Sequence, residues 1–71
     1  MVKVRDIIEA VEAAGWVYVR TKGDHRQYVR PGQPGIVTIP GRPGEDMPEG
    51  TLTRVCRQAG IDKDALKRGR R

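Results

Sequence analysis

The chain has 71 residues, with 14 Lys or Arg against 9 Asp or Glu, a net charge of +5 and a pI near 10.0. This length supports a single small domain, whose core is too small to enclose a large cofactor or a deep substrate cleft. The excess of positive charge favours polyanionic partners, first nucleic acid and then acidic proteins.

Cysteine content and hydropathy bear on the compartment. No apolar run approaches the roughly 20 residues that a membrane span requires, and the N-terminal segment MVKVRDIIEA carries charges where a secretory signal has an apolar stretch. Cys56 is the only cysteine, so we expect neither an internal disulfide nor a thiolate zinc site. We therefore expect a cytoplasmic protein with no membrane association, no metal and no other cofactor, in which Cys56 is an inert, buried apolar residue.

The first part of the chain predicts an amphipathic helix followed by a hairpin. Apolar residues recur at helical spacing over about residues 3–14, and Gly15 is placed to end that helix. Extended patterns follow at 16–21 and 25–30, with a glycine-containing turn between them. The first of these strands carries apolar side chains on both faces, so its register stays open.

The second part predicts one further strand and a second helix. IVTI at 36–39 is interpreted as a third strand, and the Pro- and Gly-rich residues 40–50 as a long surface loop. Helical spacing returns over about 51–59, and a glycine follows that can end the helix. Asp62 is expected to cap a last short turn through Leu66.

Together these elements predict an α+β fold of order α-β-β-β-α, in which two helices cover one face of a three-stranded antiparallel sheet. The other face of the sheet is then left open as a binding surface. We expect a single domain over residues 1–66 and a basic, frayed tail over 67–71.

His25 is the only histidine, and it follows the predicted turn among several cationic side chains that would attract a phosphodiester. An imidazole has an ordinary pKa of about 6.5, so it can accept or donate a proton at neutral pH. Cleavage of RNA by its own 2′-hydroxyl requires such a proton carrier. The plain alternative is a surface histidine without a role, and spacing alone favours that alternative.

The three aromatic residues offer stacking surfaces for bases, but their sequence contexts differ. Trp16 and Tyr18 are interpreted as core or helix-packing residues rather than as platforms for bases. For Tyr28 the two interpretations stay balanced. Gly23 is interpreted as a structural residue, because a tight turn between the first two strands requires a positive φ there.

Three segments taken together resemble the HicA toxins: G-W and R-T-K-G-D-H within residues 15–25, V-T-I-P-G at 37–41 and G-T-L-T-R-V-C-R-Q-A-G-I at 50–61. The resemblance covers nearly the whole chain. It implies a fold similar to double-stranded-RNA-binding domains and the activity of a toxin that cleaves mRNA. It also implies a HicB-like antitoxin as partner, and it matches the family's catalytic histidine to His25.

The resulting hypothesis is a metal-free endoribonuclease in which His25 transfers a proton. The residues expected to contact RNA are Arg20, Lys22, Arg26 and Tyr28. One histidine cannot act as both base and acid, so Tyr28, Lys22 or solvent is expected to carry the second proton.

Three positions depart from the family's pattern. Asp24 stands where serine is common, Arg26 where a second histidine or an apolar residue is frequent, and Arg42 where many members have histidine. Asp24 either orients the neighbouring His25 or repels the phosphate, and the sequence leaves both open. Two other functions also stay open: a non-catalytic RNA-binding module of the same fold, and an adaptor that binds only protein.

Overall fold

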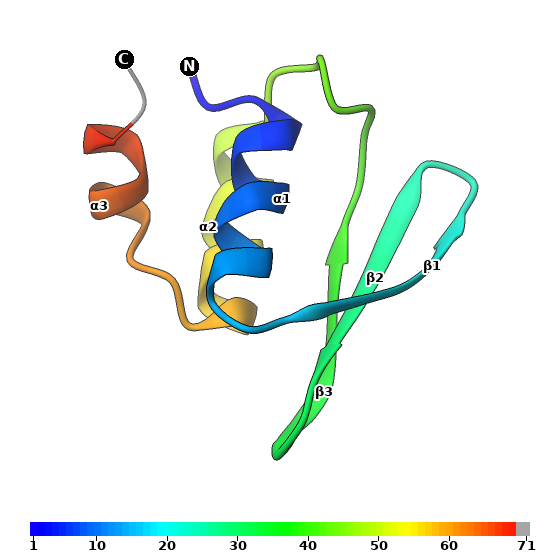
Figure 1. Cartoon of the computed structure of the whole chain (residues 1–71). Coiled ribbons are helices and arrows are strands. Elements are labelled where there is room, and N and C mark those ends of the chain that lie inside the picture. The colour runs from blue at the N-terminus through cyan, green and yellow to red at the C-terminus, as the bar shows by residue number, and fades with distance from the viewer. Residues whose placement is uncertain (70–71) are drawn as a thin grey trace.

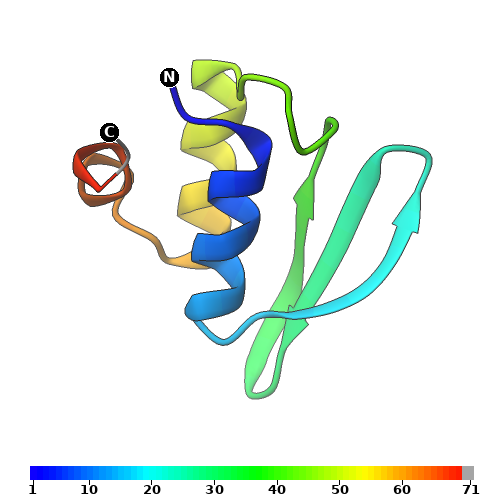
Figure 2. The same cartoon turned by 45° about the horizontal axis from the view of Figure 1, so that its top comes forward.

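A computed structural model describes residues 1–69 and shows a three-stranded sheet with helices on one side of it (Figure 1). The elements are α1 (Val4–Ala13), β1 (Val17–Lys22), β2 (His25–Arg30), β3 (Gln33–Ile39), α2 (Glu49–Ala59) and α3 (Lys63–Arg68). The strands are antiparallel in the order β1-β2-β3. Helices α1 and α2 both lie against one face, and α3 lies farther from the sheet (Figure 2). The predicted α+β fold is confirmed.

The core lies between the two longer helices and the inner face of the sheet. It combines the apolar stripes of both helices with inward side chains of the strands, chiefly Val4, Ile7, Val11, Leu52, Val55, Tyr28, Val37 and Ile39. Trp16 is only 5% exposed, and its Nε1 donates a hydrogen bond of 3.1 Å to the Ala59 carbonyl. This bond ties the start of β1 to the end of α2, which confirms Trp16 as a core residue.

Strand β3 begins at Gln33, three residues before the expected start. The sequence places Pro34 and Gly35 there, and both were expected to break the strand. Because β3 pairs only with β2, it is an edge strand, where proline is tolerated since an outward N–H is not needed for the ladder. The pairing of Arg30 with Gln33 leaves two residues for the turn between β2 and β3.

The loop after β3 is anchored to the start of α1. The N–H groups of Val4 and Arg5 lack partners within their helix, as in the first turn of every helix, and they donate to the carbonyls of Glu45 (2.9 Å) and Pro43 (3.0 Å). The Met47 N–H then donates a hydrogen bond of 2.9 Å to the Val2 carbonyl, and the Met47 side chain is buried. The predicted loop therefore has a fixed course.

Helix α3 is held against α2 by a polar clamp. The Nζ atoms of Lys63 and Lys67 each lie 2.9 Å from Oε2 of Glu49, the first residue of α2. The side chain of Asp62 accepts a hydrogen bond from the Asp64 N–H, so the expected cap is confirmed. Lys67 and Arg68, which the sequence placed in a basic tail, are helical, and residues 70–71 lie outside the described residues.

Candidate functional site

The turn between β1 and β2 presents His25 at one end of the sheet. Lys22 ends β1, His25 begins β2, and the two residues are cross-strand partners. Gly23 has a φ of +66°, which confirms the predicted positive φ, and the φ of Asp24 is not positive. This sign pattern is that of a type II′ hairpin turn, whose first central position requires glycine. The sequence of the turn therefore places His25 at the first position of β2.

A bulge at Val19 decides which face of the sheet Arg20 occupies. Tyr18 pairs with Tyr28, but Arg20 pairs with Gln27, so β1 has one residue more than β2 between these pairs. A single extra residue reverses the in-and-out alternation of a strand. Without the bulge, strict alternation would put Arg20 on the same face as Tyr18. The bulge moves it to the opposite face, where its Nε donates a hydrogen bond of 2.8 Å to Oε1 of Gln27.

The face of the sheet that the helices leave uncovered carries His25, and we call it the open face. Cross-strand pairing and alternation assign to it Val17, Arg20, Lys22, His25, Gln27, Val29 and Thr38. These side chains form rows across the strands: Lys22 with His25, then Arg20 with Gln27 and Thr38. Gln27 and Thr38 were not among the predicted site residues, although counting two residues on from His25 finds Gln27.

Arg26 and Tyr28 do not share this face. They alternate with His25 along β2, so they point toward the helices. Tyr28 is only 1% exposed, and burial raises the pKa of its hydroxyl above the ordinary value. Arg26 is half-buried, and its Nε is enclosed without a hydrogen-bond partner within residues 1–69. The four residues predicted to contact RNA are thus divided, and only Arg20 and Lys22 lie on the face of His25.

Asp24 contacts the imidazole directly. Its Oδ1 lies 3.1 Å from Nδ1 of His25, and both side chains are about half exposed, at 55% and 53%. A carboxylate only accepts hydrogen bonds, so this contact favours the tautomer of a neutral imidazole with its proton on Nδ1 and its lone pair on Nε2. Of the two roles that the sequence left open for Asp24, this contact supports orientation of His25.

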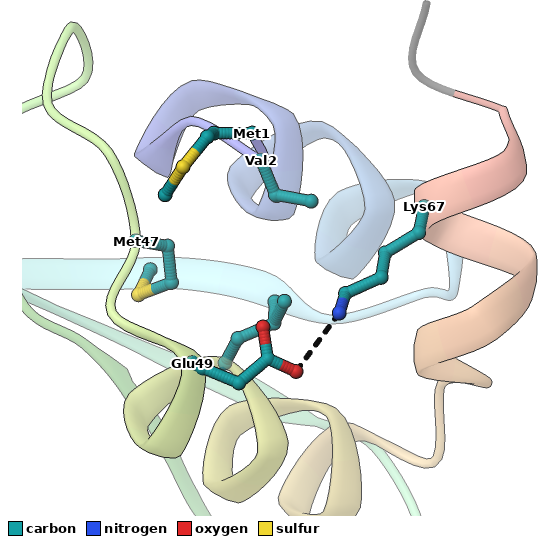
Figure 3. Close-up of a pocket in the computed structure, with 6 residues that line it drawn as sticks. Met1, Val2, Met47, Glu49 and Lys67 are labelled. Carbon is teal, nitrogen blue, oxygen red and sulfur yellow. Dashed lines mark hydrogen bonds and ion pairs between the residues drawn. The ribbon is translucent and has the colours of Figure 1, made fainter.

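A pocket of about 290 Å³ lies elsewhere, among the N-terminus, α2 and α3 (Figure 3). It is lined by Met1, Val2, Met47, Glu49, Leu52 and Lys67, none of which was predicted to contact RNA. Its charged side chains, Glu49 and Lys67, are paired with each other. The candidate site is therefore an exposed surface rather than this pocket.

Two features of residues 1–69 concern metal binding and membrane crossing. No three His, Cys, Asp or Glu side chains gather there in a group able to hold a metal ion. No helix in the same range is long and apolar enough to cross a membrane. Cys56 is buried, and burial raises the pKa of its thiol, as expected for an unreactive apolar residue.

Comparison with protein families bears on the identity of the chain. A family model described as the HicA toxin of bacterial toxin-antitoxin systems matches residues 4–61, which include both longer helices and all three strands. A search of curated proteins gives no match.

Proposed function

The chain belongs to the HicA toxin family of bacterial toxin-antitoxin systems, and from this premise we propose that it is an endoribonuclease that cleaves mRNA through His25 without a metal ion. The observation that carries the proposal is the arrangement at the hairpin. His25 has a carboxylate on Nδ1 and the cationic Lys22 opposite it, and Arg20 lies in the next row of the same face. A proton carrier thus lies beside groups that attract phosphate.

The proposed reaction uses only the RNA and protein side chains. The 2′-oxygen of a ribose bonds to the adjacent phosphorus while the bond from phosphorus to the 5′-oxygen of the next nucleotide breaks. Nε2 of His25 takes the proton of the 2′-hydroxyl or gives one to the leaving 5′-oxygen. The products are a 2′,3′-cyclic phosphate and a free 5′-hydroxyl, so atoms and charge balance.

A second proton carrier is required for the other oxygen. Tyr28 is unsuited to this role, because it is buried on the far face and its hydroxyl has a raised pKa. Lys22 is the cross-strand partner of His25 and remains available, as does water. We assign the second transfer to one of these two.

Arg20 and Lys22 supply the phosphate contacts of the proposal. The hydrogen bond to Gln27 uses Nε of Arg20 and holds the guanidinium in place. An arginine has four further N–H donors, which can reach phosphate oxygens in the paired geometry that suits a guanidinium. Such contacts give affinity and position without reading the base sequence.

The decisive experiment compares the parent chain with His25→Ala on a single-stranded RNA. Loss of proton transfer should lower the cleavage rate by about a hundredfold or more. RNA affinity should stay nearly unchanged, because one neutral contact adds little beside the cations. Growth arrest on expression should be lost together with cleavage, and circular dichroism should show an intact fold.

The outcomes separate the competing functions. Cleavage by His25→Ala at the parent's rate, in a preparation shown free of other nucleases, would refute the assignment of His25. RNA binding without any cleavage by the parent would instead favour a non-catalytic RNA-binding module, which the cations of the open face also support.

A further inference from the structure

The middle of the open face carries a side-chain amide whose orientation is fixed. Gln27 lies on the central strand β2, two residues and about 7 Å along the strand from His25. Its Oε1 accepts the hydrogen bond of 2.8 Å from Nε of Arg20. A guanidinium only donates hydrogen bonds, so the oxygen of the amide faces Arg20 and the Nε2 group faces away from it. Gln27 therefore presents its donor end to a ligand on this face.

The donors of this row are free to bind a ligand. Within residues 1–69, the side chain of Gln27 makes no hydrogen bond other than the one from Arg20. Thr38 is the cross-strand partner of Gln27 on β3, and in the same range its hydroxyl makes no hydrogen bond. Directly opposite side chains of an antiparallel pair lie within contact distance of each other. The row thus offers an amide NH₂ group and a hydroxyl side by side, next to His25.

We propose that Gln27 is a specificity-determining residue, which selects guanine in the nucleotide next to the cleaved phosphate. The inference rests on the proposed function and deepens it, because it names the base that the same site prefers. Guanine presents two neighbouring acceptors, O6 and N7, which match the donors of Gln27 and Thr38. Adenine has an amino group in place of O6, so a donor would face a donor.

The bond to Arg20 decides between the two purines. A glutamine with both ends of its amide free suits adenine, since its oxygen accepts from the adenine amino group while its nitrogen donates to N7. In this chain the oxygen end of Gln27 is turned toward Arg20, and the donor end remains. The same bulge that brings Arg20 to the open face therefore also sets which base Gln27 can read.

The position of Gln27 relates the base to the cleaved bond. Two residues along a strand span about 7 Å, which is comparable to one nucleotide of an extended RNA strand. Proteins read single-stranded RNA by hydrogen bonds to base edges that no second strand covers. When the scissile phosphate lies at His25, the base of a neighbouring nucleotide is within reach of Gln27. Arg20 and Lys22 then supply affinity for phosphate, and Gln27 supplies selectivity.

The test uses RNAs that can be cleaved at one phosphate only. Each is a 2′-O-methyl RNA with a single free 2′-hydroxyl, and the base on either side of that phosphate is varied in turn. At one of the two positions, kcat/KM of the parent should be at least about fivefold higher for guanine than for adenine. Inosine keeps O6 and N7 and should match guanine, whereas 2-aminopurine lacks O6 and should match adenine.

Two variants of Gln27 change the donors in different ways. Gln27→Glu replaces them by acceptors and should reverse the preference in favour of adenine, whose amino group donates. Its negative charge weakens binding of every RNA alike, so the ratio of kcat/KM between two bases isolates base reading. Gln27→Met has neither donor nor charge and should abolish the preference. The control is Gln58→Glu on the exposed side of α2, which makes the same charge change away from the sheet and should keep the parent's preference.

Two results would overturn the proposal: a parent without a preference at either position, or a preference that persists in Gln27→Met, which would leave Gln27 only as a support for Arg20. Thermal melting checks folding, and Gln27→Met alone decides the matter if the glutamate variant does not fold. If the parent cleaves no RNA, fluorescence anisotropy with the same RNAs still measures the preference. Tighter binding of guanine that is lost in Gln27→Met then upholds base reading while the proposed nuclease function falls.

Discussion

Replacing Asp24 by asparagine should slow RNA cleavage only moderately. Oδ1 of Asp24 lies 3.1 Å from Nδ1 of His25, and this contact favours the tautomer with the proton on Nδ1, in which Nε2 can accept another. Asparagine keeps the shape, but its amide can also donate to Nδ1 and so favour the tautomer with the proton on Nε2. The variant therefore weakens the orientation of the His25 imidazole, while the shape of the side chain and the hairpin stay the same.

The exposure of the pair sets the size of the effect. Both side chains are about half exposed, and an ion pair or charged hydrogen bond at such a site contributes about 0.2–1 kcal/mol. This energy corresponds to a rate loss of about 1.4-fold to 5-fold. A buried aspartate-histidine pair of a hydrolase, by contrast, contributes a factor of about 10⁴. A small loss is thus the specific expectation from this geometry.

Two measurements check the Asp24 prediction. Single-turnover cleavage of one RNA gives the rate, and ¹⁵N chemical shifts of the imidazole give the tautomer whether or not the chain cleaves RNA. The parent should show the proton on Nδ1, and Asp24→Asn should show a mixture. A faster rate with tighter RNA binding in Asp24→Asn would mean that repulsion of phosphate outweighs orientation, and the reasoning would be refuted.

Three further predictions concern the frame around the site. Gly23→Val should lower the melting temperature, because a positive φ costs a residue with a Cβ about 1–2 kcal/mol even where open space surrounds it; equal melting of the valine variant would contradict the turn geometry. Arg26→Met should raise the melting temperature by about 4–8 °C, because removing an enclosed Nε that has no hydrogen-bond partner within residues 1–69 stabilises the fold by about 1 kcal/mol. Filter binding should show that the matched change Arg20→Met weakens RNA affinity and that Arg26→Met does not. Equal losses of RNA affinity in the two variants would mean that Arg26 also contacts RNA. Hydrogen bonds from Lys63 and Lys67 lower the pKa of Glu49 below its ordinary value of 4.5, so the clamp on α3 is complete above that value and is lost as the pH falls through the lower pKa of the folded state. Amide protection factors of α3 should drop in that window for the parent and stay flat for Glu49→Gln, and a parent with constant protection would exclude the clamp.

The sequence by itself determined the elements and the candidate histidine. Apolar spacing predicted both longer helices because a helix that covers a sheet must bury one stripe of side chains. Gly23 predicted the hairpin, since a positive φ at a tight turn is a local requirement of the backbone. His25 became the catalytic candidate because the chain resembles the HicA toxins, whose catalytic histidine matches the only imidazole of this sequence.

Only the tertiary structure decided which side chains surround His25. The bulge at Val19 depends on how β1 pairs with β2, and nothing within β1 specifies an extra residue there. That one residue brings Arg20 to the face of His25, while strict alternation along β2 sends Arg26 and Tyr28 to the helix side. The course of the loop before α2 depends likewise on carbonyls meeting the free N–H groups of α1. Such features depend on contacts between segments far apart in the chain, and local patterns of apolar, polar and turn residues do not predict those contacts.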